Sequence, residues 1–172
     1  MRILMTLMLV VVLVSGCNKE DLKLQAAEQL LPAGLFVTSP PSGAVDVVAA
    51  RTTAKDGDEI VIKGQVAGAK EPLAANRAIM TIADLSLPTC DKTPNDTCKT
   101  PWDACCEPTD DIARKSLSVQ VVGPDGRPIK AGLGGNSGLA PLKQVVVAGT
   151  VKIPSGSTAP VIEAKRIYVV SN

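Results

Sequence analysis

From residue 55 onward, runs of β-branched residues alternate with clusters of glycine, proline and serine. In the first run, Ile60 and Ile62 alternate with the charged Glu59 and Lys63, a period of two that is typical of a half-buried β-strand. Runs of the same kind follow, and the predicted strands cover residues 58–66, 78–85, 116–122, 144–153 and 161–170. Five short strands with no long helix between them predict an all-β fold, a small closed or partly open barrel.

Two glycines and one glycine-rich stretch change this picture locally. Gly64 and Gly149 lie inside predicted strands, where a glycine usually marks a bulge or a sharp bend. Residues 130–138 contain four glycines and predict a flexible loop.

Before residue 55 the pattern favours short helices and flexible connections. Residues 19–31 predict one short helix, and the alanine-rich residues 44–54 predict another at the edge of the domain. Proline and glycine cluster at residues 32–34 and 39–43, which is typical of a tether.

The N-terminus carries a targeting signal. Arg2 precedes an apolar run over residues 3–14 that only Thr6 interrupts, and the small residues Ser15 and Gly16 follow. These are the three regions of an export signal. The run would reach only about 18 Å as a helix, which is too short for a hydrocarbon core of about 30 Å. We therefore expect residues 1–16 to be a signal peptide.

The residues that follow, Val14-Ser15-Gly16-Cys17, resemble the lipobox of bacterial lipoproteins. The resemblance implies that the signal is removed and that the Cys17 thiol receives a diacylglyceryl group. Several acyl chains, each contributing about 0.8 kcal/mol per buried methylene, would hold the protein stably on a lipid bilayer. Asn18 stands where an aspartate often marks inner-membrane retention in that family, which favours the outer membrane or the cell surface. A plain signal peptide with an incidental cysteine is the alternative.

Composition and charge exclude several classes of function. Without the signal, the chain keeps 17 basic and 17 acidic residues, so it has no basic surplus for binding nucleic acid. Only 2% of its residues are aromatic, too few for base-stacking platforms. Histidine is absent, which excludes imidazole catalysis and His-ligated metal sites.

Several short sequence motifs in the predicted strands resemble those of OB-fold modules. They read Gly57-Asp58-x-Ile60 leading to Gly64-x-Val66, then Val147-x-Gly149-Thr150-Val151 and Ala164-x-x-Ile167-x-Val169. The chain also resembles uncharacterised exported bacterial lipoproteins that carry a cysteine cluster within such a barrel. The resemblance implies a five-stranded OB-like barrel over residues 55–172 with a cysteine-rich insertion at residues 86–111. A partly helical tether over residues 17–54, beginning with lipidated Cys17, would precede it.

The insertion holds the chemically distinctive residues, Cys90, Cys98, Cys105 and Cys106. Two of them end copies of a T-P-x-D-x-C hexapeptide, at residues 93–98 and 100–105. In such a hexapeptide Thr can cap a turn, Pro fits the first helical position and Asp can bond back to the cap. We therefore expect two short helical turns that each deliver a cysteine.

Two disulfides are the first interpretation of these four residues, because exported domains commonly oxidise an even number of cysteines. A bridge between the neighbours Cys105 and Cys106 would be strained. Cys90 would then pair with either Cys105 or Cys106, and Cys98 with the other. The insertion has little aliphatic content, so such cross-links would be needed to order it.

A four-thiolate site for zinc, copper or an iron–sulfur cluster is the second interpretation, with the same four cysteines as ligands. The C-x7-C-x6-C-C spacing lacks the usual C-x2-C pairs, and the side chains of adjacent cysteines are expected to diverge. A redox switch through a vicinal Cys105–Cys106 disulfide is the third. We expect no other metal and no cofactor.

Taken together, these patterns predict a lipid-anchored protein of the cell envelope that faces the periplasm or the cell surface. We expect a binding or structural module rather than an enzyme, because no base, nucleophile or carboxylate pair stands out apart from the cysteines. Its partner would be an envelope protein or a small ligand. A Cys-ligated metal-binding or thiol-redox protein is the alternative.

Overall fold

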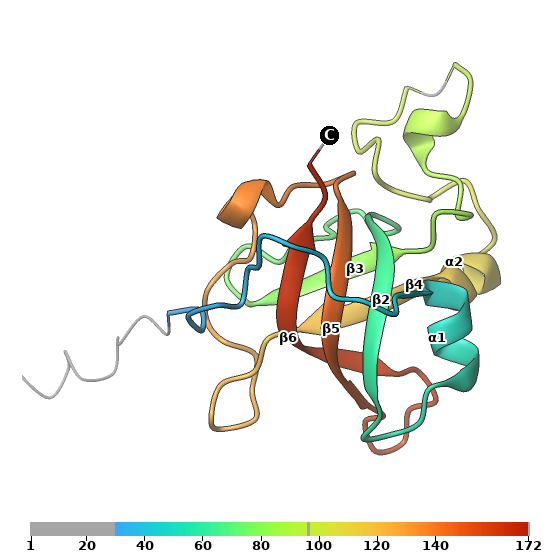
Figure 1. Cartoon of the computed structure of the whole chain (residues 1–172). Helices are drawn as coiled ribbons and strands as arrows, with labels where there is room; N and C mark the ends of the chain where they lie inside the picture. Colours follow the sequence, from blue (N-terminus) through green and yellow to red (C-terminus); the bar gives the residue numbers. More distant parts are fainter. Residues whose placement is uncertain (1–29, 96, 172) are drawn as a thin grey trace, which may run out of the picture.

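The computed structural model describes residues 30–95 and 97–171 (Figure 1). The signal peptide, Cys17, Asn18 and almost all of the helix predicted over residues 19–31 lie outside these residues. The elements, in chain order, are β1 (Val45–Asp46), α1 (Val47–Thr53), β2 (Glu59–Val66), β3 (Ile79–Ala83), the 3-10 turn η2 (Cys90–Lys92), α2 (Thr109–Lys115), β4 (Ser116–Gln120), the 3-10 turn η3 (Asn136–Gly138), β5 (Gln144–Lys152) and β6 (Val161–Val169).

The strands form a closed mixed barrel. Strand β2 pairs with β3, β3 with β4, β4 with β6 and β6 with β5, and a β2–β5 pairing closes the ring. Only the β4–β6 pairing within this ring is parallel. The predictions of an all-β fold and of five barrel strands are confirmed, and each strand lies within the range that the sequence pattern predicts. The short helix predicted in residues 44–54 is also present, as α1.

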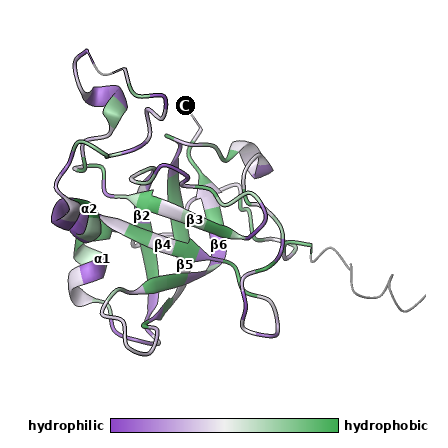
Figure 2. Cartoon of the chain, turned by 180° about the vertical axis from the view of Figure 1, so that it is seen from behind, coloured by the Kyte–Doolittle hydropathy of each residue, from purple (hydrophilic) through white to green (hydrophobic). Residues whose placement is uncertain are grey.

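The barrel interior is aliphatic. Alternate residues of each strand point inward, and Figure 2 shows how apolar positions concentrate on the strands while the loops are mostly polar. Ile62, Met80, Val119, Val147 and Ile162, one from each barrel strand, are almost fully buried in a single core cluster. Burial of such side chains contributes roughly 1.5–3 kcal/mol each to the stability of the barrel.

Both strand glycines mark close contacts between backbones. The β5–β6 register shifts between Ala148 and Gly149, which confirms the predicted irregularity at this position. A Cβ atom at Gly149 would lie 2.3 Å from the carbonyl oxygen of Glu163, and one at Gly64 would lie 2.8 Å from that of Ala83. Only glycine lets the strands approach so closely here.

The described part of the predicted tether lies against the barrel. Leu35, Val47 and Ala50 belong to the same buried cluster as the strands, and β1 pairs in parallel with β2. The chain enters along β6, because the Ile167 N–H donates to the Leu35 carbonyl and the Val37 N–H donates to that of Ile167. Residues 35–54 are thus part of the folded unit. Among the described residues, no helix has the length and apolar character needed to cross a membrane.

The glycine-rich loop is held by the core rather than flexible as its composition predicts. Leu133 and Leu139 are almost fully buried in the barrel cluster. A Cβ atom at Gly132 would lie 2.6 Å from the carbonyl oxygen of Ala75. Two isolated leucines among glycines give too weak a pattern for this docking to be seen in the sequence.

Candidate functional site

The cysteine segment, residues 86–111, projects from one end of the barrel. In Figure 1 it is the yellow-green excursion that carries η2, on the side of the molecule opposite to the blue start of the described chain. Figure 2, seen from behind, shows the same separation. The barrel therefore stands between the entry of the chain and the cysteines.

A small apolar cluster and two hydrogen bonds join the segment to the barrel. Leu87 and Ala104 are buried against Ala67 and Ala83, and the side chain of Trp102 packs on the same cluster. The Gly68 N–H donates to the Trp102 carbonyl over 2.9 Å, and the Trp102 indole N–H donates to the Lys70 carbonyl over 3.0 Å. A third hydrogen bond, from the Asp84 N–H to the Lys115 carbonyl over 2.7 Å, joins the chain just before the segment to the chain just after it.

Within the segment, two stretches of backbone lie side by side. The Cys90 N–H donates to the Asp103 carbonyl over 2.8 Å, and the Asp91 N–H donates to the Pro101 carbonyl over 2.9 Å. This pairing places residue 90 next to residues 104–106. As a result, Cys90 meets cysteines that follow it by fifteen and sixteen positions.

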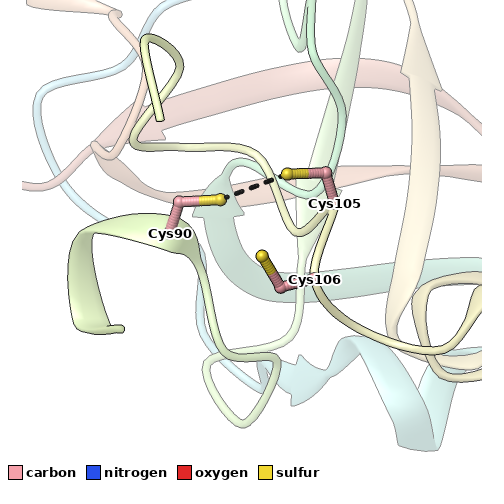
Figure 3. A group of neighbouring side chains, drawn as sticks. All are labelled: Cys90, Cys105 and Cys106. Carbon is pink, nitrogen blue, oxygen red and sulfur yellow. Dashed lines mark hydrogen bonds between the residues drawn. The ribbon is translucent and has the colours of Figure 1, made fainter. Parts of the chain in front are cut away.

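The sulfur atoms of these cysteines converge (Figure 3). The Cys90 and Cys105 sulfurs lie 3.6 Å apart, and those of Cys98 and Cys105 lie 4.0 Å apart. The sulfurs of Cys90, Cys105 and Cys106 all lie within 4.8 Å of one another. Cys90 is buried, Cys98 is half-buried, and Cys105 and Cys106 are exposed. We call these four residues the thiol cluster.

No disulfide joins the four cysteines, contrary to the first interpretation of the sequence. The separation of 3.6 Å between the Cys90 and Cys105 sulfurs is far longer than a disulfide bond of about 2.05 Å. The segment has other sources of order in this structure. Leu87, Ala104 and Trp102 supply apolar contacts, and backbone hydrogen bonds across the segment complete its order.

The expectation that adjacent cysteines diverge is also wrong here. The sulfurs of Cys105 and Cys106 both lie within 4.8 Å of the Cys90 sulfur and of each other. The backbone at residues 105–106 forms a turn, which is followed by a Glu107 N–H donating to the Ala104 carbonyl. A turn allows neighbouring side chains to point the same way, whereas an extended strand would send them to opposite faces.

The hexapeptide repeat forms a turn rather than the predicted helical turn in its second copy. The Asp103 N–H donates to the Thr100 carbonyl over 2.9 Å, which closes a single β-turn. The first copy contains Asp96, which lies outside the described residues. The cysteines that end the two copies, Cys98 and Cys105, nevertheless lie close together, with their sulfurs 4.0 Å apart.

Neighbouring groups shift the ionisation of two thiols in opposite directions. The Cys98 sulfur lies 3.3 Å from the Thr100 hydroxyl oxygen, and hydrogen bonding with Thr100 lowers the pKa of the Cys98 thiol. Contact with Cys90 alone would lower the pKa of the Cys105 thiol, but contact with Cys98, burial and contact with Cys106 outweigh it and raise that pKa. Cys98 is therefore the thiol that ionises more readily of the two.

The acidic side chains around the segment make structural hydrogen bonds. Asp84 accepts the Val48 and Ser86 N–H groups, Asp91 accepts the Thr89 hydroxyl, and Asp103 accepts the Ala104 N–H. These carboxylates do not converge on one another among the described residues, because the clustered metal-binding side chains found there are cysteines. The group of potential metal-binding atoms found in the segment is therefore made of sulfurs.

Sequence reasoning missed helix α2, which leads from the segment back into β4. Pro108 caps the helix, Asp110 and Asp111 occupy its first turn, and Arg114 and Lys115 occupy its last. This charge order matches the helix dipole and could have predicted the helix. Its shortness, seven residues, hides it among the polar residues of the insertion.

A cavity of about 390 Å³ lies beside α1, β3 and β4. Arg51, Thr81, Ser116 and Ser118 contribute to its lining. The Arg51 guanidinium donates to the Ser116 carbonyl over 3.0 Å, and burial lowers its pKa. The Arg51 side chain thus connects α1 to the start of β4.

Comparison with known proteins assigns no family to this chain. No protein-family model matches the chain, and no curated protein sequence matches it. A search of solved structures finds an OBody bound to hen egg-white lysozyme, with a TM-score of 0.38 and 15% sequence identity. The match covers 79% of this chain and 98% of the OBody chain.

Proposed function

We propose that this protein is a lipid-anchored, non-catalytic binding module of the cell envelope. Its OB-like barrel acts as the scaffold, and the cysteine segment is the part that contacts a ligand or partner. The opposite placement of chain entry and cysteine segment carries this proposal (Figure 1).

The sequence of the N-terminus supports the anchoring. An acylated Cys17 would lie thirteen positions before Leu30, the first described residue. The chain then follows β6 through the backbone hydrogen bonds of Leu35 and Val37 with Ile167. A membrane at that side would leave the cysteine segment on the far side of the barrel, accessible to the aqueous compartment.

The strand pairing supports an OB-like architecture. The long first barrel strand, β2, pairs with both β3 and β5, and the parallel β4–β6 contact completes the ring. The sequence motifs around Gly64, Gly149 and Ile167 lie on β2, β5 and β6, in the order that the family resemblance implies.

The chemistry of the chain supports binding rather than catalysis. It contains no histidine, and the described acids of the segment accept structural hydrogen bonds. A general base placed beside an activated nucleophile would be the usual sign of an enzyme. The thiol cluster, by contrast, offers several soft donor atoms at one point.

Substitution of Cys17 by serine tests the anchoring. The proposal predicts that Cys17→Ser shifts the protein from the membrane fraction to the soluble exported fraction and removes the acyl mass from its N-terminus. Cys98→Ser, which leaves the lipobox intact, is the matched control and stays with the membrane. Retention of the Cys17→Ser chain in the membrane, with unchanged mass, would contradict the proposal.

A further inference from the structure

We propose that Cys90, Cys98, Cys105 and Cys106 form a tetrahedral four-thiolate site for a zinc ion. This inference deepens the proposed binding function by naming the ligand of the cysteine segment. It rests on that proposal only for its setting in the envelope, since the site itself is argued from sulfur geometry.

Two of the sulfur separations are close to the edge length of a metal–thiolate tetrahedron. A tetrahedron with Zn–S bonds of about 2.3 Å has sulfur–sulfur edges of about 3.8 Å. The Cys90–Cys105 and Cys98–Cys105 separations are 3.6 and 4.0 Å, one on each side of that value. The third contact partner, Cys106, lies within 4.8 Å of both Cys90 and Cys105.

The pattern of contacts separates a metal site from a pair of disulfides. A disulfide requires each sulfur to have one near partner, and the other pair can lie anywhere else. Here Cys105 lies near the sulfurs of Cys90, Cys98 and Cys106 at once. Cys105 is therefore a common neighbour of the other three sulfurs, as one ligand of a shared ion would be. Cys98 lies outside the mutually close group of Cys90, Cys105 and Cys106, so its sulfur would move toward them when an ion binds.

The segment holds the ligands in place by contacts that do not involve an ion. Cys90 is buried and its N–H is bonded to the Asp103 carbonyl, while Ala104, beside Cys105, is packed in the apolar cluster with Leu87. The Thr100 hydroxyl lies 3.3 Å from the Cys98 sulfur, where it can donate to a thiolate and orient it. Preorganisation of this kind lowers the cost of assembling four like charges around one cation.

The donor set selects the class of metal. Four thiolates suit borderline or soft ions such as zinc and copper(I), while calcium and magnesium take oxygen ligands. Zinc needs no redox partner and adopts the four-coordinate closed geometry of structural sites. Binding one Zn²⁺ to four thiols forms four Zn–S bonds and releases four protons to solvent, leaving a centre with a charge of −2.

Titration of the full-length chain, purified in detergent and fully reduced under a chelator, tests the site. After the chelator is removed, Zn²⁺ should bind at about one ion per chain, as expected for one closed site. Co²⁺ should bind first with the intense visible bands of a tetrahedral thiolate complex and should then be displaced by Zn²⁺. Four cysteines that react with maleimide in the metal-free chain should become protected.

Two variants identify the donor atoms. Cys98→Ser, at a half-buried position that leaves the core intact, should weaken Zn²⁺ binding at least tenfold and reduce the charge-transfer band of Co²⁺. Asp110→Asn removes an exposed acid of the same segment and should bind both ions like the parent chain. Circular dichroism and thermal unfolding of each variant show whether the barrel is folded.

Three results would overturn the inference. They are a folded, reduced chain that binds no zinc, a Cys98→Ser variant with parental affinity, and a chain that binds copper(I) but not zinc. Because the titration measures metal and the Cys17→Ser experiment measures membrane association, failure of one is distinguishable from failure of the other.

Discussion

The carboxylate of Asp84, just after β3, accepts the backbone N–H of Val48 in the first turn of α1 over 3.1 Å. Its second oxygen accepts the Ser86 N–H over 3.0 Å. Asp84 is mostly buried, and it joins helix α1, strand β3 and the start of the cysteine segment. One side chain thus supports both the barrel and the candidate site.

Asp84→Asn should destabilise the protein in a pH-dependent way. Burial by itself would raise the pKa of Asp84, but hydrogen bonds from Ser86 and Val48 outweigh it and hold that pKa below its ordinary value. A depressed folded-state pKa adds stability above the unfolded-state value of about 3.9, and this contribution is lost as the pH falls through the folded-state value.

We therefore expect Asp84→Asn to lower the free energy of unfolding by about 1 kcal/mol at pH 7, because one of the two part-buried N–H groups loses its acceptor. The difference from the parent should shrink as the pH falls below the unfolded-state pKa. Urea denaturation at several pH values measures it, with Asp110→Asn as an exposed control. If the stability difference between Asp84→Asn and the parent stayed constant across the pH range, the stabilising role of the ionised Asp84 carboxylate would be contradicted.

Gly149→Ala tests the close contact between β5 and β6. The new Cβ atom would lie 2.3 Å from the Glu163 carbonyl oxygen, a backbone atom that cannot move without disturbing the ladder. We expect a loss of about 1–3 kcal/mol, the usual cost of overpacking, seen as a lower midpoint in chemical denaturation.

The matched control is Gly134→Ala, where the nearest atom would be the Leu73 Cδ1 at 3.7 Å, an ordinary contact. It should stay within about 0.5 kcal/mol of the parent, as most tolerated substitutions do. Equal losses at both positions would show that the bulge at Gly149 has no special requirement for glycine.

Trp102→Phe tests the attachment of the cysteine segment. It keeps an aromatic ring on Leu87 and Ala104 but removes the hydrogen bond to the Lys70 carbonyl. Loss of about 1 kcal/mol should speed amide exchange roughly fivefold within residues 86–111. Exchange in the barrel strands should stay unchanged, and Tyr168→Phe on β6 should alter neither region. If amide exchange within residues 86–111 were as slow in Trp102→Phe as in the parent, the indole would not hold the segment in place.

Metal removal should change the response of the thiol cluster to oxidants. In the zinc-free chain, glutathione disulfide should oxidise two protein thiols to a disulfide and be reduced to two molecules of glutathione. Cys90 and Cys105 should pair first, since their sulfurs are 3.6 Å apart. The zinc-loaded chain should keep four thiols far longer, by mass mapping after alkylation. Equal oxidation rates with and without zinc would show that no ion protects the sulfurs.

The sequence predicts the barrel well because each strand has its own local signal. Ile60 and Ile62 alternate with charged residues, and such a period identifies a strand without knowledge of its partners. The loop containing Leu133 has no comparable period, so its docking into the core depends on contacts distant in sequence.

The thiol cluster could be predicted only in part. The four cysteines stand out in composition, but their convergence depends on the pairing of residues 90–91 with residues 101–103 and on the turn at residues 105–106. Neither follows from the C-x7-C-x6-C-C spacing, which resembles no standard metal motif. Hydrogen bonds between two irregular stretches leave no periodic pattern, so the sequence does not reveal how the four sulfurs come together.

X-ray absorption at the zinc edge of the protein isolated from envelopes tests the central claim most directly. A four-thiolate site predicts about one zinc per chain with four sulfur neighbours at about 2.3 Å and no oxygen or nitrogen in the first coordination shell. Protein isolated without zinc and with its cysteines joined in disulfides would contradict the account, as would a zinc ion coordinated mainly by oxygen.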